Sequence, residues 1–557
     1  MPPDAARPGP WQATAGGTAV PGTLCARRAQ RLGATRRSPA RQGGAQGATA
    51  RDRCAAAARR GHDRRRRGGG PPPCPGGGAR PAAGLRVVRR RMARRRARRQ
   101  RPAAAQHGGV HGQHARRPRP HARSHARLHA RLDARLDGGT PMTAHRLDRV
   151  LQQDLCSGCG ACAFVGRDHG VVMLDIPTVG RRPVGTEGLP TALKDEIVRA
   201  CPGSQVTSPG WPATPDPSAL LVGPTEAIWE GWATDPVLRW AGSSGGVVTA
   251  LATYALEELE MALVVHTGMD DTMPWGNRTV VSRDRASLLH NSGSRYTTSS
   301  PVEALDLIES ADRPCVFVGK PCDVAAVREL RRERPALDRN LGLVLSFFCA
   351  GTPPSDASLR LAAELGFGEP AAISQVRYRG EGWPGSFVVG STDGHRSELT
   401  YDESWGRLAS TPRQLRCTLC ADGLGELADV TGGDAWHRHS DEPGGASDGV
   451  SLILARTTRG RTVVEGAIEA GYLTATVSDA SDVVLAQPLT RRRMLVPART
   501  AALRTAGLAA PRYPGFRLGA AARLLGPRAW AKEYAGMVRR IVTRGLWRRG
   551  RHMGRTR

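Results

Sequence analysis

Residues 155–162 read Leu-Cys-Ser-Gly-Cys-Gly-Ala-Cys, so that Cys156, Cys159 and Cys162 are each separated by two residues. The small residues between them allow the backbone to fold around a cubane and to direct N–H groups at its sulfur atoms. Cys201, which precedes a proline, supplies a remote fourth thiolate. This spacing is typical of a 4Fe–4S cluster, whereas zinc more often uses paired C-x2-C units. These four cysteines are therefore the predicted ligands of a 4Fe–4S cluster, and a zinc site is the alternative.

Two further cysteines follow predicted strands. Cys322 comes after the apolar run Cys315–Gly319, and Cys349 comes directly after the apolar run 343–348. If these strands are parallel neighbours, both thiols emerge at the same edge of the sheet. Open α/β sheets bind ligands at the carboxyl ends of their strands.

Late in the chain, Cys417 and Cys420 form a C-x-x-C pair. Alone, this pair is compatible with zinc, with redox chemistry or with chance. Together with Cys322 and Cys349 it makes four candidate ligands for a second cluster. Cys315 lies inside an apolar run and is expected to be a small buried side chain.

The turn Ser243-Ser244-Gly245-Gly246 opens a predicted helix over 247–260, with Thr249 in its first turn. Free N–H groups and the helix dipole at such a start suit a phosphate, and the serines can cap the helix or bind a pyrophosphate. An ordinary capped helix would look the same. The chain has neither a G-x-G-x-x-G fingerprint nor a P-loop.

A second Gly/Ser loop, 292–296, places Ser294, Arg295 and Tyr296 as candidates for contact with the same ligand. A solvated turn is the alternative interpretation of Arg295 and Tyr296.

Residues 1–141 differ in composition from the rest of the chain. They contain 33 Arg, no Lys, five Asp and no Glu, so they contribute +28 of the formal net charge of +31. With Trp11 as the sole aromatic residue, this segment cannot bury enough surface to offset the entropy of folding. We expect either a disordered arm or a mis-assigned start in GC-rich DNA, with Met142 as the initiator. A basic arm that binds nucleic acid is the alternative, but no RNA-binding motif supports it.

Beyond this arm, apolar strand-like runs such as 261–267 alternate with amphipathic helical patterns, which predicts an α/β fold with a mixed or parallel sheet. No segment of the sequence reaches 18 consecutive apolar residues, so no transmembrane helix is predicted. The cysteines, without a secretion signal, indicate a reducing, cytoplasmic location. The predicted organisation is an arm (1–141), a ferredoxin-like 4Fe–4S module (142–218), an FAD-binding α/β region (219–370), a C-terminal region with second-cluster ligands (371–487) and a basic tail (488–557).

Together these motifs resemble the beta subunits of coenzyme F-420-dependent hydrogenases and dehydrogenases, a family that includes the iron–sulfur flavoprotein reductase acting on hydroxymethyl chlorophyll. The similarity covers residues from about 150 to 487. Besides the cysteine patterns, the motifs that carry it are Ser244-Gly245-Gly246, Gly293-Ser294-Arg295-Tyr296, Gly319-Lys320-Pro321-Cys322, Phe348-Cys349, Cys417-x-x-Cys420-Ala-Asp422, Ala428-Asp429-Val430 and Gly433-Asp434-Ala-Trp436.

The resemblance implies FAD held by the Ser-Gly-Gly helix start and neighbouring loops, with Lys320 in one of them. It also implies a second 4Fe–4S cluster near the flavin and coenzyme F-420 as hydride donor or acceptor. Two positions depart from the family pattern: Arg295 stands where Lys is expected, and Lys320 stands where Thr is common. A guanidinium and an ammonium are not interchangeable, so contacts at Arg295 are expected to differ.

The predicted function is an oxidoreductase that passes electrons between reduced coenzyme F-420, or ferredoxin, and an acceptor through FAD and two 4Fe–4S clusters. A self-contained reductase of an organic double bond or hydroxymethyl group remains open. A non-catalytic electron-transfer adaptor subunit of a larger hydrogenase or dehydrogenase is the other alternative, with the basic tail as its docking or membrane-surface contact. The catalytic residues are unknown from the sequence, and His266 and His290 are candidates only by location.

Overall fold

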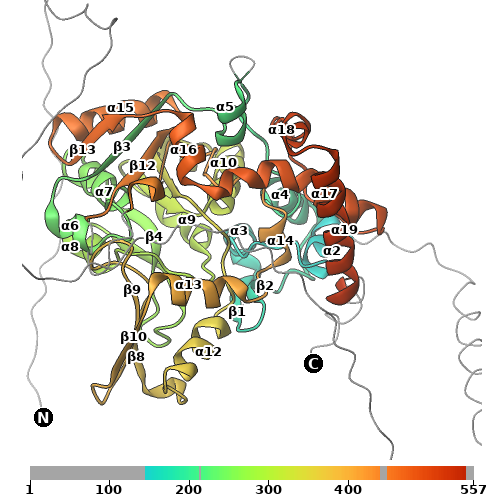
Figure 1. The fold of residues 1–557 in the computed structure, drawn as a ribbon, viewed down its shortest axis with the longest axis horizontal. Coiled ribbons are helices and arrows are strands. Elements are labelled where there is room, and N and C mark those ends of the chain that lie inside the picture. The colour runs from blue at the N-terminus through green and yellow to red at the C-terminus, as the bar shows by residue number, and fades with distance from the viewer. Residues whose placement is uncertain (1–144, 212–214, 440–447, 547–557) are drawn as a thin grey trace, which may run out of the picture. The chain divides into compact units, whose positions relative to one another are not determined.

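The computed structural model of the chain describes residues 145–211, 215–439 and 448–546, which all belong to one compact unit, Arg119–Arg557. The predicted arm, residues 1–141, lies outside the described residues. An eight-stranded mixed sheet with the order β13-β3-β12-β11-β7-β6-β4-β5 forms the centre (Figure 1). Its strands are β3 (Ala227–Ala233), β4 (Val264–Met269), β5 (Asn277–Ser282), β6 (Cys315–Gly319), β7 (Leu341–Phe347), β11 (Val430–Asp434), β12 (Ser451–Ala455) and β13 (Leu473–Val477).

The middle of this sheet is parallel. β4, β6, β7 and β11 are parallel neighbours, and the outer strands pair antiparallel. The predicted parallel pairing of the two strands that precede Cys322 and Cys349 is therefore confirmed, as is the α/β fold class. The carboxyl ends of four strands meet at one edge, where such sheets bind ligands.

Side chains alternate between two apolar layers along the central strands. Val264 and Val316 pack with α7 (Val247–Glu257) and α15 (Thr458–Glu469) on one face. Val265 and Phe317 pack on the other face, against α9 (Leu305–Glu309) and α10 (Pro321–Glu333). All four side chains are fully buried, and each burial of this kind contributes roughly 1.5–3 kcal/mol. The two layers hold the parallel strands in register and so fix the loops at their carboxyl ends.

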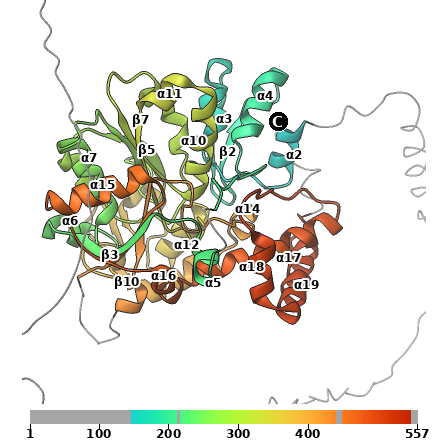
Figure 2. The same cartoon turned by 90° about the horizontal axis from the view of Figure 1, so that it is seen from above.

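The first cysteines belong to a small module built from α2 (Arg146–Gln152), α3 (Ala161–Val165), β1 (Val172–Ile176), β2 (Gly180–Val184) and α4 (Thr191–Ala200). Figure 2 shows α3 and α4 beside α10 of the central domain, and α4 contacts α10. Gly160 makes the close approach possible: its φ is 102°, and a Cβ there would lie 2.6 Å from the carbonyl oxygen of Ser300.

A three-stranded antiparallel sheet carries the remaining strands, β8 (Ile373–Arg377), β9 (Ser386–Ser391) and β10 (Arg396–Thr400). It packs against α12 (Asp356–Glu364) and α13 (Tyr401–Ser410). The other helices are α5 (Pro217–Val222), α6 (Pro236–Ala241), α8 (Arg285–His290), α11 (Pro335–Asn340), α14 (Leu415–Thr418) and α16 (Ala480–Ala486), with short 3-10 turns η1 (Arg167–His169), η2 (Pro301–Ala304), η3 (Pro370–Ala372), η4 (Trp436–Arg438) and η5 (Pro488–Arg491).

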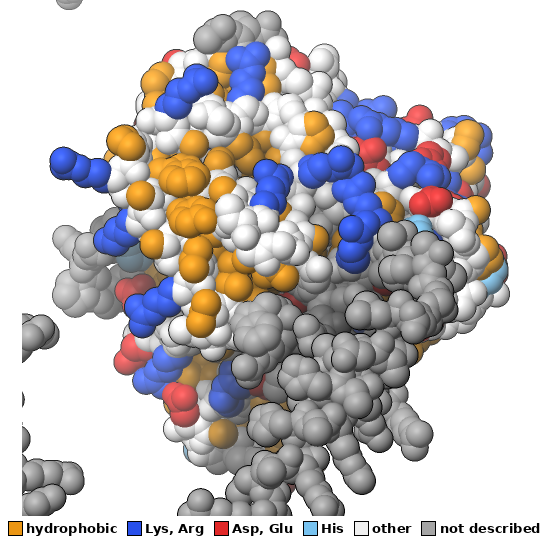
Figure 3. All heavy atoms as spheres, turned by 90° about the vertical axis from the view of Figure 1, so that its right-hand side faces the viewer, with side chains coloured by type: hydrophobic (Ala, Val, Ile, Leu, Met, Phe, Trp, Pro, Cys, Tyr) orange, Lys and Arg blue, Asp and Glu red, His pale blue; other side chains and the backbone are white. Residues whose placement is uncertain are grey.

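The basic C-terminal segment is folded through residue 546. It forms α17 (Arg492–Thr505), α18 (Leu518–Leu525) and α19 (Pro527–Thr543). Met537 and Ile541 of α19 share a core with Val150 and Leu155 of the first module. Figure 3 shows the side of the molecule that carries these helices, where hydrophobic side chains lie among Lys and Arg side chains. Within the described ranges, no helix is long and apolar enough to cross a membrane.

Candidate functional site

A cavity of about 350 Å³ opens at the carboxyl edge of the parallel strands. Lys320 follows β6, Phe348 follows β7 and Asp434 ends β11, and all three line this cavity. Its volume falls within the range of about 300–1,000 Å³ that is usual for small-molecule and cofactor sites. The edge predicted from the strand order is therefore the place where the chain can hold a ligand.

Eight of the nine predicted flavin contacts line this cavity: Ser243, Ser244, Gly246, Thr249, Ser294, Arg295, Tyr296 and Lys320. Gly245 does not. It lies against β3, where a Cβ would be 2.7 Å from the carbonyl oxygen of Gly231. Gly246 has a φ of 72°, which favours glycine, and it directly precedes the first residue of α7.

The two serines act differently from the cap that the sequence suggested. No side chain caps α7. The Ser243 hydroxyl accepts a hydrogen bond from the Ser294 amide, and the Ser244 hydroxyl donates to the Val450 carbonyl at 2.9 Å. The serines thus tie three loops together, and the first N–H groups of α7 remain available to a ligand in the cavity.

Arg295 is a clamp within the protein. Its guanidinium donates to the Asn277 side chain at 2.7 Å and to the carbonyl oxygens of Pro274, Val376 and Gly276. Arg295 therefore does not lie in a solvated turn. These bonds engage all three guanidinium nitrogens. Contact between Arg295 and a flavin stays a prediction.

One wall of the cavity was not predicted from the sequence. Arg379, with its side chain 3% exposed, donates to Asp434 through both terminal nitrogens, at 3.0 and 2.6 Å. Its guanidinium lies 4.8 Å from the ring centre of Tyr401 and 5.2 Å from that of Trp436. Burial lowers the pKa of Arg379, but Asp434 outweighs this effect and raises it overall. The wall combines flat rings with a guanidinium whose charge is paired with Asp434, and such a flat surface suits an aromatic ring system.

Of the two candidate histidines, His266 lines the cavity. His266 is buried, and its Nε2 lies 2.8 Å from the Ser282 hydroxyl. Burial lowers the pKa of His266 to about 4, so the ring is neutral near pH 7. His290 ends α8 and does not line the cavity.

The first cysteine set (Cys156, Cys159, Cys162 and Cys201) lines one small pocket of its own. All four side chains are buried. The Gly158 amide donates to the sulfur of Cys156 at 3.3 Å. Burial raises the pKa of Cys201 to about 11, with a contribution from Cys156. Four buried thiols that disfavour each other's ionisation, and that receive backbone N–H groups, fit the thiolates of a cationic iron cluster.

The members of the second cysteine set (Cys322, Cys349, Cys417 and Cys420) influence one another's pKa. Burial raises the pKa of Cys349 to about 12, with contributions from Cys417 and Cys420. The pKa of Cys322 is raised mainly by burial, with contributions from Cys349 and Cys420. Cys349 also lines the large cavity, so this set borders the candidate flavin site. Cys315 is fully buried in the sheet, as expected.

Among the described residues, no three Cys, His, Asp or Glu side chains converge as ligands of a single metal ion would. A 4Fe–4S cluster does not need such convergence, because each thiolate binds a separate iron.

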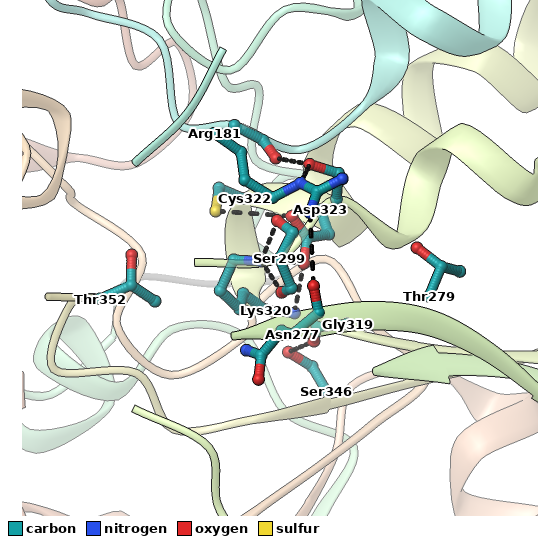
Figure 4. Close-up of polar contacts among 12 residues, drawn as sticks. Arg181, Asn277, Thr279, Ser299, Gly319, Lys320, Cys322, Asp323, Ser346 and Thr352 are labelled. Carbon is teal, nitrogen blue, oxygen red and sulfur yellow. Dashed lines mark hydrogen bonds and ion pairs between the residues drawn. The ribbon is translucent and has the colours of Figure 1, made fainter. Parts of the chain in front are cut away.

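Lys320 lines the cavity, and Cys322 of the second cysteine set lies near it (Figure 4). Its ammonium donates to Asp323 at 2.7 Å and to the Ser299 hydroxyl at 2.8 Å. Burial lowers the pKa of Lys320, but Asp323 and Cys322 outweigh this effect and raise it overall. Lys320 therefore stays protonated and places a positive charge at this border.

Fold and site together define an α/β protein with a cofactor-sized cavity and two cysteine sets. Residues 228–306 match the family model for the N-terminal part of the coenzyme F420 hydrogenase/dehydrogenase beta subunit, and residues 312–481 match the family model for its C-terminal part. These two matches support the coenzyme F-420 hydrogenase/dehydrogenase beta subunit family for this chain. The second cysteine set falls inside the matched residues, whereas the first set precedes them.

Relatives of known identity are distant. The chain is 24% identical over 261 residues to the coenzyme F-420 hydrogenase subunit beta of Methanothermobacter thermautotrophicus, which covers 45% of this chain and 84% of the relative. It is 23% identical over 249 residues to the F-420-dependent formate dehydrogenase 1 subunit beta of Methanococcus maripaludis, which covers 43% and 59%. A chain of the F-420-reducing NiFe hydrogenase complex from Methanosarcina barkeri matches with a TM-score of 0.39 and 20% identity, covering 50% of this chain and 94% of that one.

Proposed function

We propose that the chain is the electron-transferring subunit of a coenzyme F-420-linked oxidoreductase that uses FAD and two 4Fe–4S clusters. The observation that carries this proposal is the placement of the second cysteine set at the border of the cavity, with Cys349 in the cavity wall. A flavin exchanges hydride with a two-electron carrier and single electrons with iron–sulfur clusters, so it connects the two kinds of partner.

The chain's own residues have separable tasks in this scheme. The start of α7 offers backbone N–H groups to a phosphate. The ring of Trp436 and the guanidinium of Arg379, which is paired with Asp434, offer a flat stacking surface. Lys320 keeps a proton and a positive charge beside the cavity. The first cysteine set would hold the outer cluster, and the second set would hold the cluster nearer the flavin.

Names of relatives favour a subunit over a self-contained reductase, because both the hydrogenase and the formate dehydrogenase relatives are named as beta subunits. We therefore place the acceptor on a partner protein of the same soluble, cytoplasmic compartment. Docking through the basic C-terminal segment stays a prediction.

To test this proposal, the anaerobically purified chain is mixed with reduced coenzyme F-420, and its reduction is monitored in the visible spectrum of the protein. We expect the flavin and cluster bands to bleach together. Replacing Cys349 by Ala should leave flavin reduction intact and slow the bleaching of the remaining cluster. Replacing Cys315 by Ala is the matched control, because Cys315 is a fully buried cysteine of the same sheet that lines neither the cavity nor the pocket of the first set. A flavin-loaded chain that this donor does not reduce would contradict the F-420 assignment.

A further inference from the structure

Arg416 lies between the two cysteine sets. It belongs to α14, directly before Cys417, and it is 2% exposed. Its Nε donates at 2.9 Å to the carbonyl oxygen of Pro202, the residue after Cys201. Leu415 and Leu419, on either side of it in the sequence, share an apolar cluster with Cys201. The segment that carries two ligands of the second set is therefore packed directly against the first set.

Among the described residues, no ion pair joins Arg416 to a carboxylate. Its guanidinium lies instead 5.7 Å from the ring centre of Tyr513. Burial raises the pKa of Tyr513, whose hydroxyl donates to the Leu419 carbonyl and stays neutral. A buried cation needs an anion close by, and the cysteines are the groups here that can supply one.

Arg182 provides the contrast. It also lies between the sets, because its hydrogen-bond partners are Asp154, two residues before Cys156, and Gln414, three residues before Cys417. However, its guanidinium donates to Asp154 at 2.5 Å and to the Gln414 side chain at 2.8 Å. A carboxylate thus offsets the charge of Arg182, while the charge of Arg416 is left for the cysteine sets.

This inference rests on the proposed function. We propose that Arg416 is a positioning residue whose fixed positive charge acts on both clusters and raises their reduction potentials. Each cluster gains one electron on reduction and becomes one unit more negative. A buried cation stabilises that reduced form more than the oxidised form, because charges interact strongly where water is excluded. Net charge and hydrogen bonding are known determinants of cluster potential.

The test is an EPR-monitored redox titration of the full chain with Arg416→Gln, Arg416→Lys and the control Arg459→Gln. Arg459 also donates to main-chain carbonyls, those of Leu341 and Gly342, but it lies at the opposite end of β7 from Cys349. We expect Arg416→Gln to make reduction at least tenfold less favourable, a shift of about 59 mV for a one-electron couple. Arg416→Lys should move the potentials much less, and Arg459→Gln should leave them unchanged.

Iron analysis separates the possible failures. A wild-type chain without clusters would refute the proposed function before Arg416 is tested. A fully loaded Arg416→Gln chain that titrates at wild-type potentials would overturn this inference alone. If Arg416→Gln does not retain iron, Arg416→Lys decides: wild-type potentials support a role of the charge. Loss of iron from the lysine variant, or a shift in its potentials as large as the one expected for Arg416→Gln, shows that the bond to Pro202 is what matters and overturns the inference.

Discussion

Replacing Asp434 by Asn removes the negative charge that faces Arg379 in the cavity wall. Asp434 Oδ1 accepts hydrogen bonds from Arg379 at 2.6 Å and from the Trp383 indole at 2.8 Å, and Oδ2 accepts one from Arg379 at 3.0 Å. Removing one partner of a buried ion pair costs about 3–5 kcal/mol. Because the Asp434 side chain is 17% exposed, we expect about 3 kcal/mol, at the lower end of that range.

Urea unfolding followed by circular dichroism measures this cost. Glu364→Gln is the control, since it breaks the exposed Arg407–Glu364 pair, with side chains 47% and 57% exposed, and should cost less than about 1 kcal/mol. Replacing Asp434 and Arg379 together by apolar residues should recover part of the loss, because no unpaired charge is left. An Asp434→Asn chain within about 1 kcal/mol of wild type, or a double variant whose loss equals the sum of the singles, would refute the reasoning.

Three further predictions follow from single positions. Gly160→Ala should lower the iron content by releasing the first cluster, since its Cβ would meet the Ser300 carbonyl at 2.6 Å; Gly170→Ala, with a similar positive φ and no atom within 4 Å, should keep its iron. His266→Phe should flatten stability between pH 4 and 6.5. Burial keeps the folded-state pKa of His266 near 4, below the ordinary 6.5. Between these values the unfolded chain binds more protons than the folded chain, so lowering the pH destabilises the wild-type fold by up to about 1.4 kcal/mol per pH unit. If urea midpoints of His266→Phe show the same pH profile as wild type, this prediction is contradicted. Cys315→Ala should retain all iron, and iron loss would show that Cys315 is a ligand.

Local patterns were enough to predict the sheet edge. Apolar runs and the turns after them located β6 and β7, and their parallel pairing brings Cys322 and Cys349 to the edge where the cavity lies. The motif spacing likewise placed the first cysteine set around one pocket. These features depend on contacts that are either short in sequence or dictated by the rules of parallel sheets.

Other features depend on contacts that no local pattern reveals. The composition after residue 488 predicted only a basic tail, but Arg493 is buried and pairs with Glu426, while Met537 packs against the first module. The Arg379–Asp434 wall joins residues 55 positions apart. A surplus of Trp and Tyr between 378 and 436 was the signal that could have indicated it. The serines before α7 were expected to cap it, but nearby loops offered better partners.

The most direct test of the account is the content of iron, sulfide and flavin in the anaerobically purified chain, compared with Cys159→Ala and Cys417→Ala variants. The account predicts about eight irons and one flavin per chain, with about half of the iron lost in each variant and flavin kept in the variant of the first set. Wild-type protein with four irons or fewer, purified without cluster loss, would contradict the two-cluster subunit and return Cys417 and Cys420 to a structural role.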